Sequence, residues 1–340
     1  MIYRFLFLGI LFMLCVFSRL LFIVSIYIMA SKGIYVEKVI VIALGGNALI
    51  RKGQRGTFQE QVENLIRITP EIARASRSYR IVLTHGNGPQ VGNLYLQQEH
   101  TRDVPPMPLH ACVAMTQSLI GYMIQTAFSK CCPELRVNVV PTRVIVDPGD
   151  LAFLNPTKPI GPYYDGAQVE DLKKKGWSLV MVPGRGWRRV VPSPKPREIV
   201  ELEQIRTSVE RFEVTVAVGG GGVPVVKQNG SLVGVDAVID KDLASSVLAV
   251  SLNAESFLIL TDVEGVYLDY GSEKQQLIRE IRLREAQELL EKGYFPPGSM
   301  GPKVEAVIEF VRATGRKAII GHLDKLEEII RGVSGTIFKP

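Results

Sequence analysis

Short runs of apolar, often β-branched residues alternate along the chain with segments of helical periodicity. The clearest runs are KVIVIAL at 38–44, RIVLTHG at 80–86, VNVVPTRVIVD at 137–147, VTVAVGGGG at 214–222, SFLILTDVEG at 256–265 and RKAIIGHL at 316–323. Apolar runs of this length, bounded by turn residues, indicate buried strands. Their alternation with helical segments predicts an α/β fold around a mainly parallel sheet.

A longer apolar run occupies residues 1–29, where Arg4, Arg19 and two serines stand among apolar residues. The run exceeds the roughly 20 residues that a membrane span needs, although Arg19 near its middle costs about 2.5 to 3.5 kcal/mol. A secretory signal would be shorter and followed by a cleavage site with small residues. Two interpretations stay open: a membrane anchor through residues 2–28 with the remaining chain facing the cytoplasm, or translation that starts at Met29, which we favour. The folded domain is expected over residues 37–340.

The composition is that of an ordinary globular protein, with 46% apolar and 22% charged residues among 340. This excludes collagen-like, disordered and disulfide-rich classes. The four cysteines have no C-x-x-C spacing and the four histidines are dispersed, so a structural zinc site is not expected and the thiols are expected to be reduced in the cytoplasm. The net charge of +6 permits an acidic partner without identifying it.

Residues 148–211 differ in character from the rest of the chain. They contain eight prolines, and from Lys173 to Arg197 there are eight Lys or Arg residues and no acidic residue. Prolines interrupt helices, so long helices are not expected here, and the positive charge suits an anionic ligand. We predict a small protruding lid inserted into the α/β domain; the alternative is a solvated surface excursion.

Several predicted strands end in glycine-rich turns. LGGNAL follows the first strand at 44–49, HGNGPQVG follows the second at 85–92, and four glycines follow the strand VTVAV. Because ligands bind outside the carboxyl ends of strands in open α/β sheets, these turns collect where a site is expected. Four glycines in succession indicate close passage of a phosphate or of another loop, which makes Gly220 and Gly221 candidate phosphate contacts.

Three lysines lie in turns bounded by glycine, proline or an apolar helix instead of on polar helix faces. Lys158 lies in NPTKPIGPYY, Lys241 in IDKDLA and Lys303 in PPGSMGPKV. Phosphoryl transfer uses such a set, because fixed positive charge, glycine amides and Mg²⁺ stabilise the charge on the migrating group without a nucleophilic side chain. The chain lacks the P-loop motif and the protein-kinase motifs.

These motifs together resemble those of the carbamate kinases of the amino-acid-kinase superfamily. The resemblance runs from about residue 37 to the end, and NPTKPIGPYY and GRGWRRVVPSP are its most specific parts. It implies a three-layer α/β/α sandwich with a lid, commonly as a homodimer. It also implies the reversible reaction of carbamate with MgATP to give carbamoyl phosphate and ADP, with Mg²⁺ held through the nucleotide phosphates and not by a dedicated protein metal site.

The resemblance also implies roles for individual residues. Lys158, Lys241 and Lys303 would stabilise charge on the phosphoryl group, and Asp240 would organise them. The loops around the small substrate and the phosphate would be formed by Gly45, Gly46, Asn47, Gly86, Asn87 and Gly88. The nucleotide side would contain Thr261, Asp262, Tyr267, Met300 and Lys303.

Two other functions are weighed against this one. A kinase of the same fold could act on another carboxylate or phosphate acceptor. A catalytically silent relative could bind nucleic acid or another ligand through the basic lid, but the lid carries no RNA-binding aromatic signature, so no nucleic-acid partner is expected.

The stretch IDKD raises a narrower question about the two acids beside Lys241. Asp240 is expected to cap the helix that follows, and Asp242 to favour its positive N-terminal end. We further expect Asp240 to fix Lys241, so that Asp240→Ala would impair turnover far more than Asp242→Ala.

Overall fold

The computed structural model describes residues 38–100 and 103–340, and every structural statement below concerns these ranges. The predicted anchor or extension at residues 1–29 lies outside them. Among the helices of the described ranges, none is both long enough and apolar enough to cross a bilayer.

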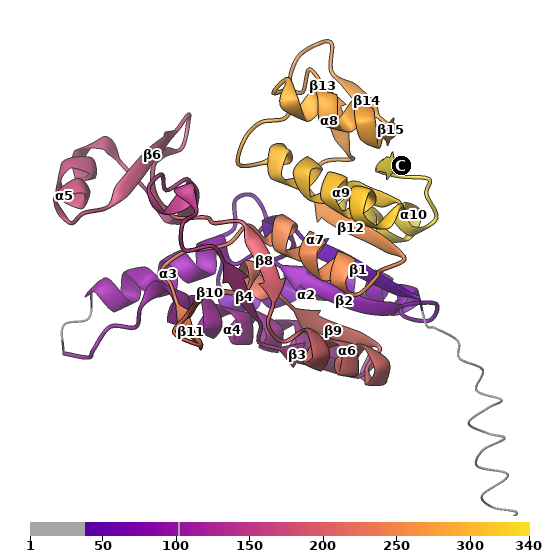
Figure 1. The fold of residues 1–340 in the computed structure, drawn as a ribbon, viewed down its shortest axis with the longest axis horizontal. Helices are drawn as coiled ribbons and strands as arrows, with labels where there is room; N and C mark the ends of the chain where they lie inside the picture. The colour runs from indigo at the N-terminus through magenta and orange to yellow at the C-terminus, as the bar shows by residue number, and fades with distance from the viewer. Residues whose placement is uncertain (1–37, 101–102) are drawn as a thin grey trace, which may run out of the picture. The chain divides into compact units, whose positions relative to one another are not determined.

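An eight-stranded sheet lies at the centre of the described chain (Figure 1). The strand order is β15-β17-β16-β12-β1-β2-β9-β3. Neighbouring strands are parallel except for β16 and β17, which are antiparallel. The strands are β1 (Val39–Leu44), β2 (Arg80–His85), β3 (Val137–Val140), β9 (Val214–Ala217), β12 (Ser256–Thr261), β15 (Glu280–Arg282), β16 (Ala318–His322) and β17 (Thr336–Lys339).

Helices cover both faces of this sheet, because its central strands are apolar on both sides. Ile40 and Ile42 of β1 pack into a core with α2, α4 and α10, whereas Val41 and Ala43 pack into a core with α6, α7, α8 and α9. The helices are α2 (Phe58–Ala75), α4 (Leu109–Cys131), α6 (Leu202–Arg211), α7 (Lys241–Ser251), α8 (Leu283–Glu291), α9 (Met300–Thr314) and α10 (Leu326–Ile330). The predicted three-layer α/β/α sandwich with a mainly parallel sheet is confirmed.

The predicted strand at 137–147 is two strands in different sheets. β3 ends at Val140, and β4 (Arg143–Val146) begins after Pro141 and Thr142. Proline cannot donate to a strand ladder, so the chain leaves the central sheet at this point. β4 lies in a second sheet of order β11-β10-β4-β8, formed with β8 (Pro196–Ile199), β10 (Val223–Gln228) and β11 (Ser231–Gly234).

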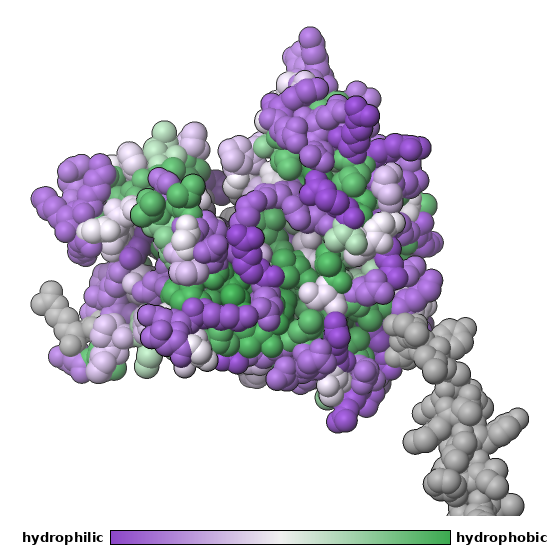
Figure 2. Space-filling view, viewed as in Figure 1, coloured by the Kyte–Doolittle hydropathy of each residue, from purple (hydrophilic) through white to green (hydrophobic). Residues whose placement is uncertain are grey.

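The lid is a three-stranded antiparallel sheet with one short helix. It contains β5 (Lys158–Tyr164), β6 (Ser178–Val182), β7 (Gly186–Val191) and α5 (Val169–Lys174). In Figure 2, hydrophilic side chains cover much of the surface at α5. The predicted range of 148–211 is too wide at its C-terminal end, because β8 pairs with β4 and α6 packs into the core.

The lid meets the sandwich along α3 (Gly88–His100) through a very close backbone contact. A Cβ atom at Gly92 of α3 would lie 1.8 Å from the backbone nitrogen of Gly161 in β5. Val91 and Ile160 are buried beside this contact in one apolar cluster. Two glycines therefore let the first lid strand, which begins at Lys158, rest directly on the helix.

The remaining strands, β13 (Val266–Leu268) and β14 (Gln276–Ile278), form a small antiparallel pair.

Candidate active site

The loops that follow β1, β2 and β12 lie at one edge of the central sheet. Leu44 at the end of β1 pairs with His85 of β2 on one side and with Leu260 of β12 on the other, so the three parallel strands end together. The first of these loops lies against the third: the amide of Gly45 donates to the carbonyl oxygen of Leu260 at 2.9 Å. A Cβ atom at Gly45 would lie 2.7 Å from the same oxygen, which explains why glycine is required there.

A narrow cavity of about 170 Å³, the lysine cavity, lies at this edge beneath the start of the lid. It is bounded by the glycine loops, the start of α7 and the start of α9. Of the residues predicted for substrate and charge stabilisation, it is lined by Gly46, Gly86, Asn87, Gly88, Lys158, Gly220, Asp240, Lys241 and Lys303. Segments distant in the sequence thus bring together all three predicted lysines.

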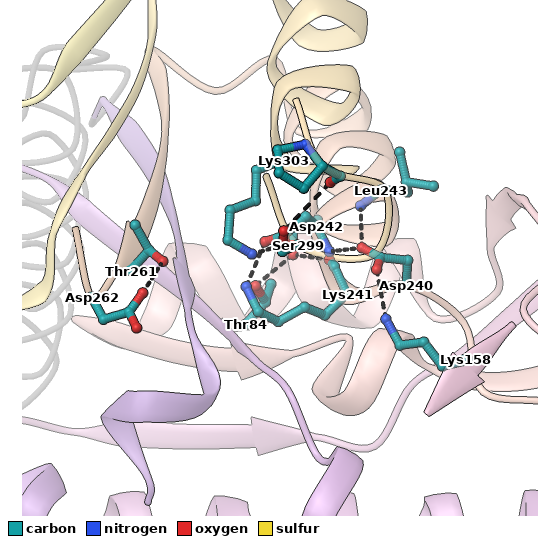
Figure 3. A network of polar contacts seen from close by, with 12 residues as sticks. Thr84, Lys158, Asp240, Lys241, Asp242, Leu243, Thr261, Asp262, Ser299 and Lys303 are labelled. Carbon is teal, nitrogen blue, oxygen red and sulfur yellow. Dashed lines mark hydrogen bonds and ion pairs between the residues drawn. The ribbon is translucent and has the colours of Figure 1, made fainter. Parts of the chain in front are cut away.

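Two aspartates hold these lysines (Figure 3). The Nζ atom of Lys158 donates to Oδ2 of Asp240 at 2.6 Å. The Nζ atom of Lys241 donates to Oδ1 of Asp242 at 2.5 Å, and that of Lys303 donates to Oδ2 of Asp242 at 2.9 Å. The expectation that Asp240 fixes Lys241 was therefore wrong: Asp242 contacts two of the lysines and Asp240 contacts one.

Asp240 does cap α7, as the sequence predicts. Its Oδ1 atom accepts from the backbone amides of Asp242 at 2.9 Å and Leu243 at 3.4 Å. This cap leaves Oδ2 of Asp240 to Lys158, whereas the side chain of Asp242 is only 3% exposed and turns toward Lys241 and Lys303. The sequence alone does not show which lysine each carboxylate contacts, because the directions of the two side chains depend on the geometry of the first turn of α7.

Burial and pairing shift the ionisation of this cluster in opposite directions. Burial by itself raises the pKa of Asp242, but Lys241 and Lys303 outweigh it and hold that pKa well below its usual range. Burial lowers the pKa of Lys241, which is more deeply buried than Lys303; beside Asp242, the pKa of Lys303 is raised. The pKa of Asp240 is lowered because Lys158 outweighs the effect of burial. Three cations and two anions leave an excess of positive charge facing the cavity.

A series of hydrogen bonds that the sequence did not reveal connects the backbone of Lys241 to the central sheet. The hydroxyls of Thr84 on β2 and Ser245 on α7 lie 2.5 Å apart, and the Ser245 hydroxyl donates to the Lys241 carbonyl oxygen at 2.5 Å. All of these residues are buried. The contacts fix the first turn of α7 against the central sheet and hence the position of Lys241.

A second cavity, of about 380 Å³, adjoins the first and is lined by aromatic residues; we name it the aromatic cavity. All residues predicted for the nucleotide side line it, together with Gly45, Gly46 and Asn47. The sequence did not reveal its other aromatic residues, Tyr270, Tyr294 and Phe295. Tyr267 and Tyr270 lie with their ring centroids 5.7 Å apart. An apolar, aromatic wall beside a few polar groups suits a planar heterocycle.

Lys303 and Ser299 line both the lysine cavity and the aromatic cavity, as does Gly46. Ser299 directly precedes α9, and its position between the two cavities was not predicted. The Thr261 hydroxyl contacts the Asp262 carboxylate at 3.1 Å on the other wall of the aromatic cavity. A ligand that extends from the aromatic wall would therefore bring its far end to the lysines.

The four-glycine turn is required mainly by packing against other loops. A Cβ atom at Gly220, where φ is +64°, would lie 2.2 Å from the side-chain nitrogen of Asn87. One at Gly221, where φ is +90°, would lie 2.4 Å from the carbonyl oxygen of Ile239. Gly220 lines the lysine cavity, whereas the close neighbour of Gly221 is the segment that leads into α7. Of the two explanations from the sequence, passage of another loop is the one that these distances support.

His85 is buried behind the second glycine loop. Its Nδ1 atom lies 3.1 Å from the Gly86 carbonyl oxygen. Burial lowers the pKa of His85 to about 4, so the ring is neutral at physiological pH. The burial of His85 and its lowered pKa agree with a structural role and not with the role of a general base.

Within the described ranges, no three His, Cys, Asp or Glu side chains gather closely enough to hold a metal ion. The carboxylate of Asp262 lies at the wall of the aromatic cavity, and Mg²⁺ beside substrate phosphates is commonly held by one or two such carboxylates. Cys112, Cys131 and Cys132 are free thiols, as expected.

Comparison with known proteins gives consistent matches over this whole domain. The pattern of the Amino acid kinase family matches residues 38–322. A carbamate kinase of Pyrococcus furiosus is 48% identical over 312 residues, which cover 89% of this chain and 99% of that protein. A carbamate kinase of Trichomonas vaginalis is 43% identical over 311 residues, covering 88% and 99%. The solved structure of a Giardia lamblia carbamate kinase bound to AMP-PNP aligns with a TM-score of 0.81 at 43% identity, covering 89% and 98%.

Proposed function

This chain belongs to the amino acid kinase family, a family of phosphotransferases that use ATP, and from that premise we propose that it is a carbamate kinase. The reaction is the reversible transfer of the γ-phosphoryl group of ATP to a carbamate oxygen, which gives carbamoyl phosphate and ADP. The acceptor is inferred from relatives that are named carbamate kinases and that align with 88% or more of this chain.

One observation carries the proposal: the lysine cavity and the aromatic cavity share a wall that contains Lys303. A nucleotide whose base contacts the aromatic residues would direct its phosphates toward that wall. The lysine cavity, at about 170 Å³, has room for a small planar anion beyond the terminal phosphate. Holding the two reactants in line supplies much of the catalysis of phosphoryl transfer.

We assign charge stabilisation to Lys158, Lys241 and Lys303. Their ammonium groups would meet the negative charge that spreads over the transferring phosphoryl oxygens. Asp240 and Asp242 fix those groups in advance, so that little reorganisation accompanies the reaction. The phosphoryl group would pass directly between the substrates, without a covalent intermediate on the enzyme.

The glycine loops would hold the small substrate and the phosphate oxygens. Gly46 and Asn47 follow β1, and Gly86, Asn87 and Gly88 lead into α3, whose N-terminal amides favour an anion. The Asn87 side chain is itself fixed, because its nitrogen donates to the hydroxyl of Thr116 at 2.9 Å. Mg²⁺, when bound with the nucleotide, would supply further positive charge at the phosphates, with Asp262 as the nearby carboxylate.

We also propose that two copies of the chain associate through the exposed side of α4. Met115, Leu119 and Tyr122 recur at helical spacing on this side, and Phe58 at the start of α2 stacks on Tyr122. These four side chains are between 41% and 57% exposed, which is high for apolar residues that share one patch. The mass in solution of the Leu119→Glu variant tests this: a loss of dimer supports the proposal, and an unchanged dimer places the interface elsewhere.

The decisive assay measures ATP formation from ADP and carbamoyl phosphate with the purified chain. Rapid formation of ATP supports the proposed reaction. Activity only with another acyl phosphate, such as acetyl phosphate, would contradict the acceptor while leaving the family intact. Intact phosphoryl transfer in Lys241→Ala would contradict the catalytic assignment and favour a different role for the lysine cavity.

A further inference from the structure

A third and larger cavity, of about 1000 Å³, lies on the lid side of the lysine cavity, and its basic residues have no role in the function proposed above. One wall is the loop between β1 and α2, and the opposite wall is formed by the lid strands β5 and β7. Its cations come from both walls: Arg51, Lys52 and Arg55 from the loop, and Arg185 and Arg188 from the lid. We name it the basic cavity.

The positive charge of this cavity is largely uncompensated. Two aspartates line it, and Asp324 is already paired with Arg51 at 3.0 Å. Over the described ranges, Lys52, Arg55, Arg185 and Arg188 form no ion pair with a carboxylate. The only other acid of the lining, Asp262, lies at the border with the aromatic cavity.

Arg188 is held in a fixed direction within the lid. Its Nε atom donates to the Gly161 carbonyl oxygen at 3.0 Å, and its guanidinium lies 5.3 Å from the centroid of the Tyr163 ring. The Tyr163 hydroxyl in turn accepts from Arg185 at 3.3 Å. These contacts leave the terminal nitrogens of Arg188 without an anionic partner while they prevent the side chain from turning away.

The basic cavity borders both of the others but differs from them in chemistry. It shares Gly46 and Pro89 with the lysine cavity, and Thr261 and Asp262 with the aromatic cavity. The aromatic residues suited to a nucleotide base line the aromatic cavity, whereas arginines and a lysine dominate the basic cavity. The two substrates would therefore reach the lysines by separate approaches.

We propose that the basic cavity captures the small anionic substrate, an acyl phosphate dianion, and guides it to the lysine cavity, with Arg55 and Arg188 as the main attracting groups. This inference rests on the proposed function, because it concerns the second substrate of that reaction. Clefts lined by charge of one sign raise the local concentration of an oppositely charged ligand and its association rate, and salt screens the effect.

The test compares Arg55→Gln, Arg188→Gln and their double variant with the unmodified full chain in ATP formation. At about 20 mM ionic strength we expect each single change to lower kcat/KM for carbamoyl phosphate about 5-fold, and the double change about 20-fold. At about 0.5 M ionic strength the losses should shrink to less than about 2-fold. The KM for ADP should change by less than about 2-fold throughout, because its base enters by the aromatic cavity.

Two controls separate charge from structure. Arg188→Lys keeps the charge and should retain most of kcat/KM, whereas a loss equal to that of Arg188→Gln would assign Arg188 a purely structural role in the lid. Lys174→Gln removes a lid cation that lies outside the cavity and is paired with Asp171. It should leave the kinetics unchanged; an equal loss there would overturn a specific role for the cavity.

Binding of a non-reactive analogue, phosphonoacetamide, gives a result that does not depend on turnover. Calorimetry at low ionic strength should show at least about 10-fold weaker binding to the double variant. Equal binding, or losses in kcat/KM that salt does not reduce, would overturn the inference. If the unmodified chain forms no ATP from carbamoyl phosphate, the proposed function fails, and the calorimetry still decides whether the basic cavity captures the anion.

Discussion

The ammonium group of Lys303 at the start of α9 lies 2.9 Å from Oδ2 of Asp242 at the start of α7. The other oxygen of the same carboxylate accepts from Lys241 at 2.5 Å. One buried anion therefore sets the separation of two cations that come from different helices. The position of positive charge in the lysine cavity therefore depends on a residue that carries the opposite charge.

We expect Asp242→Asn to lower kcat by about 10²- to 10³-fold, because two buried ammonium groups lose the anion that positions them. Asp240→Asn should cost less, about 10-fold, because an asparagine still caps α7 and only Lys158 loses its partner. Steady-state ATP formation by the two variants checks this order. A larger loss in Asp240→Asn would restore the order expected from the sequence alone.

Lys241→Gln should lower kcat by about 10²- to 10³-fold with a much smaller change in the KM for ADP, because the lysine lies away from the aromatic wall. Lys227→Gln is the matched control: Lys227 is 65% exposed on β10 and pairs with Glu198 at 3.0 Å. It should leave both constants unchanged. Similar kcat values for the two variants would exclude Lys241 from charge stabilisation.

Gly92→Ala should impair activity at a distance from the reacting groups. The new Cβ atom would lie 1.8 Å from the Gly161 nitrogen and would force β5, and with it Lys158, away from α3. We expect kcat to fall about 10-fold or more, since misplacement of a catalytic group by about 1 Å can cost 10²-fold. Gly166→Ala is the control, because a Cβ atom there has no neighbour within 4 Å. Equal activity in both variants would show that the contact between α3 and β5 can change without displacing Lys158.

His85 should make folding depend on pH between about 6.5 and 4. Its pKa is lowered from 6.5 to about 4 by burial, so in this window the unfolded chain binds a proton that the folded chain does not. The free energy of unfolding should therefore fall as the pH is lowered, by up to about 3 kcal/mol across the window.

The test measures denaturant unfolding at pH 7 and pH 4.5 for the unmodified chain and for His85→Gln, with His85→Asn as a second variant. Each variant lacks the titrating ring, so its stability should decrease less over this interval than that of the unmodified chain. The same decrease in all three proteins would contradict a buried neutral histidine.

The periodicity of the sequence predicted an α/β fold with a mainly parallel sheet, because strand and helix periodicities are local properties; the three layers were implied by the resemblance to carbamate kinases. The apolar runs at 38–44, 80–86 and 256–265 do form the centre of the sheet. The prediction of a single strand at 137–147 is wrong, because the apolar pattern continues through Pro141 whereas the hydrogen-bonded pairing of the central sheet does not. The predicted lid extends too far at its C-terminal end, because charge and proline content do not show that β8 pairs with β4.

The sequence by itself determined the kinds of residue at the site: glycines at strand ends, three lysines in constrained turns and a capped helix at Asp240. These follow from backbone freedom, charge and capping, which act within a few residues. Only the tertiary structure decided which carboxylate holds which lysine, why Gly92 and Gly161 are needed, and how Arg55 and Arg188 come to face one cavity. These contacts are made between segments that are far apart in the chain. Their energies depend on distances and burial that exist only after the sheet and its helices have packed.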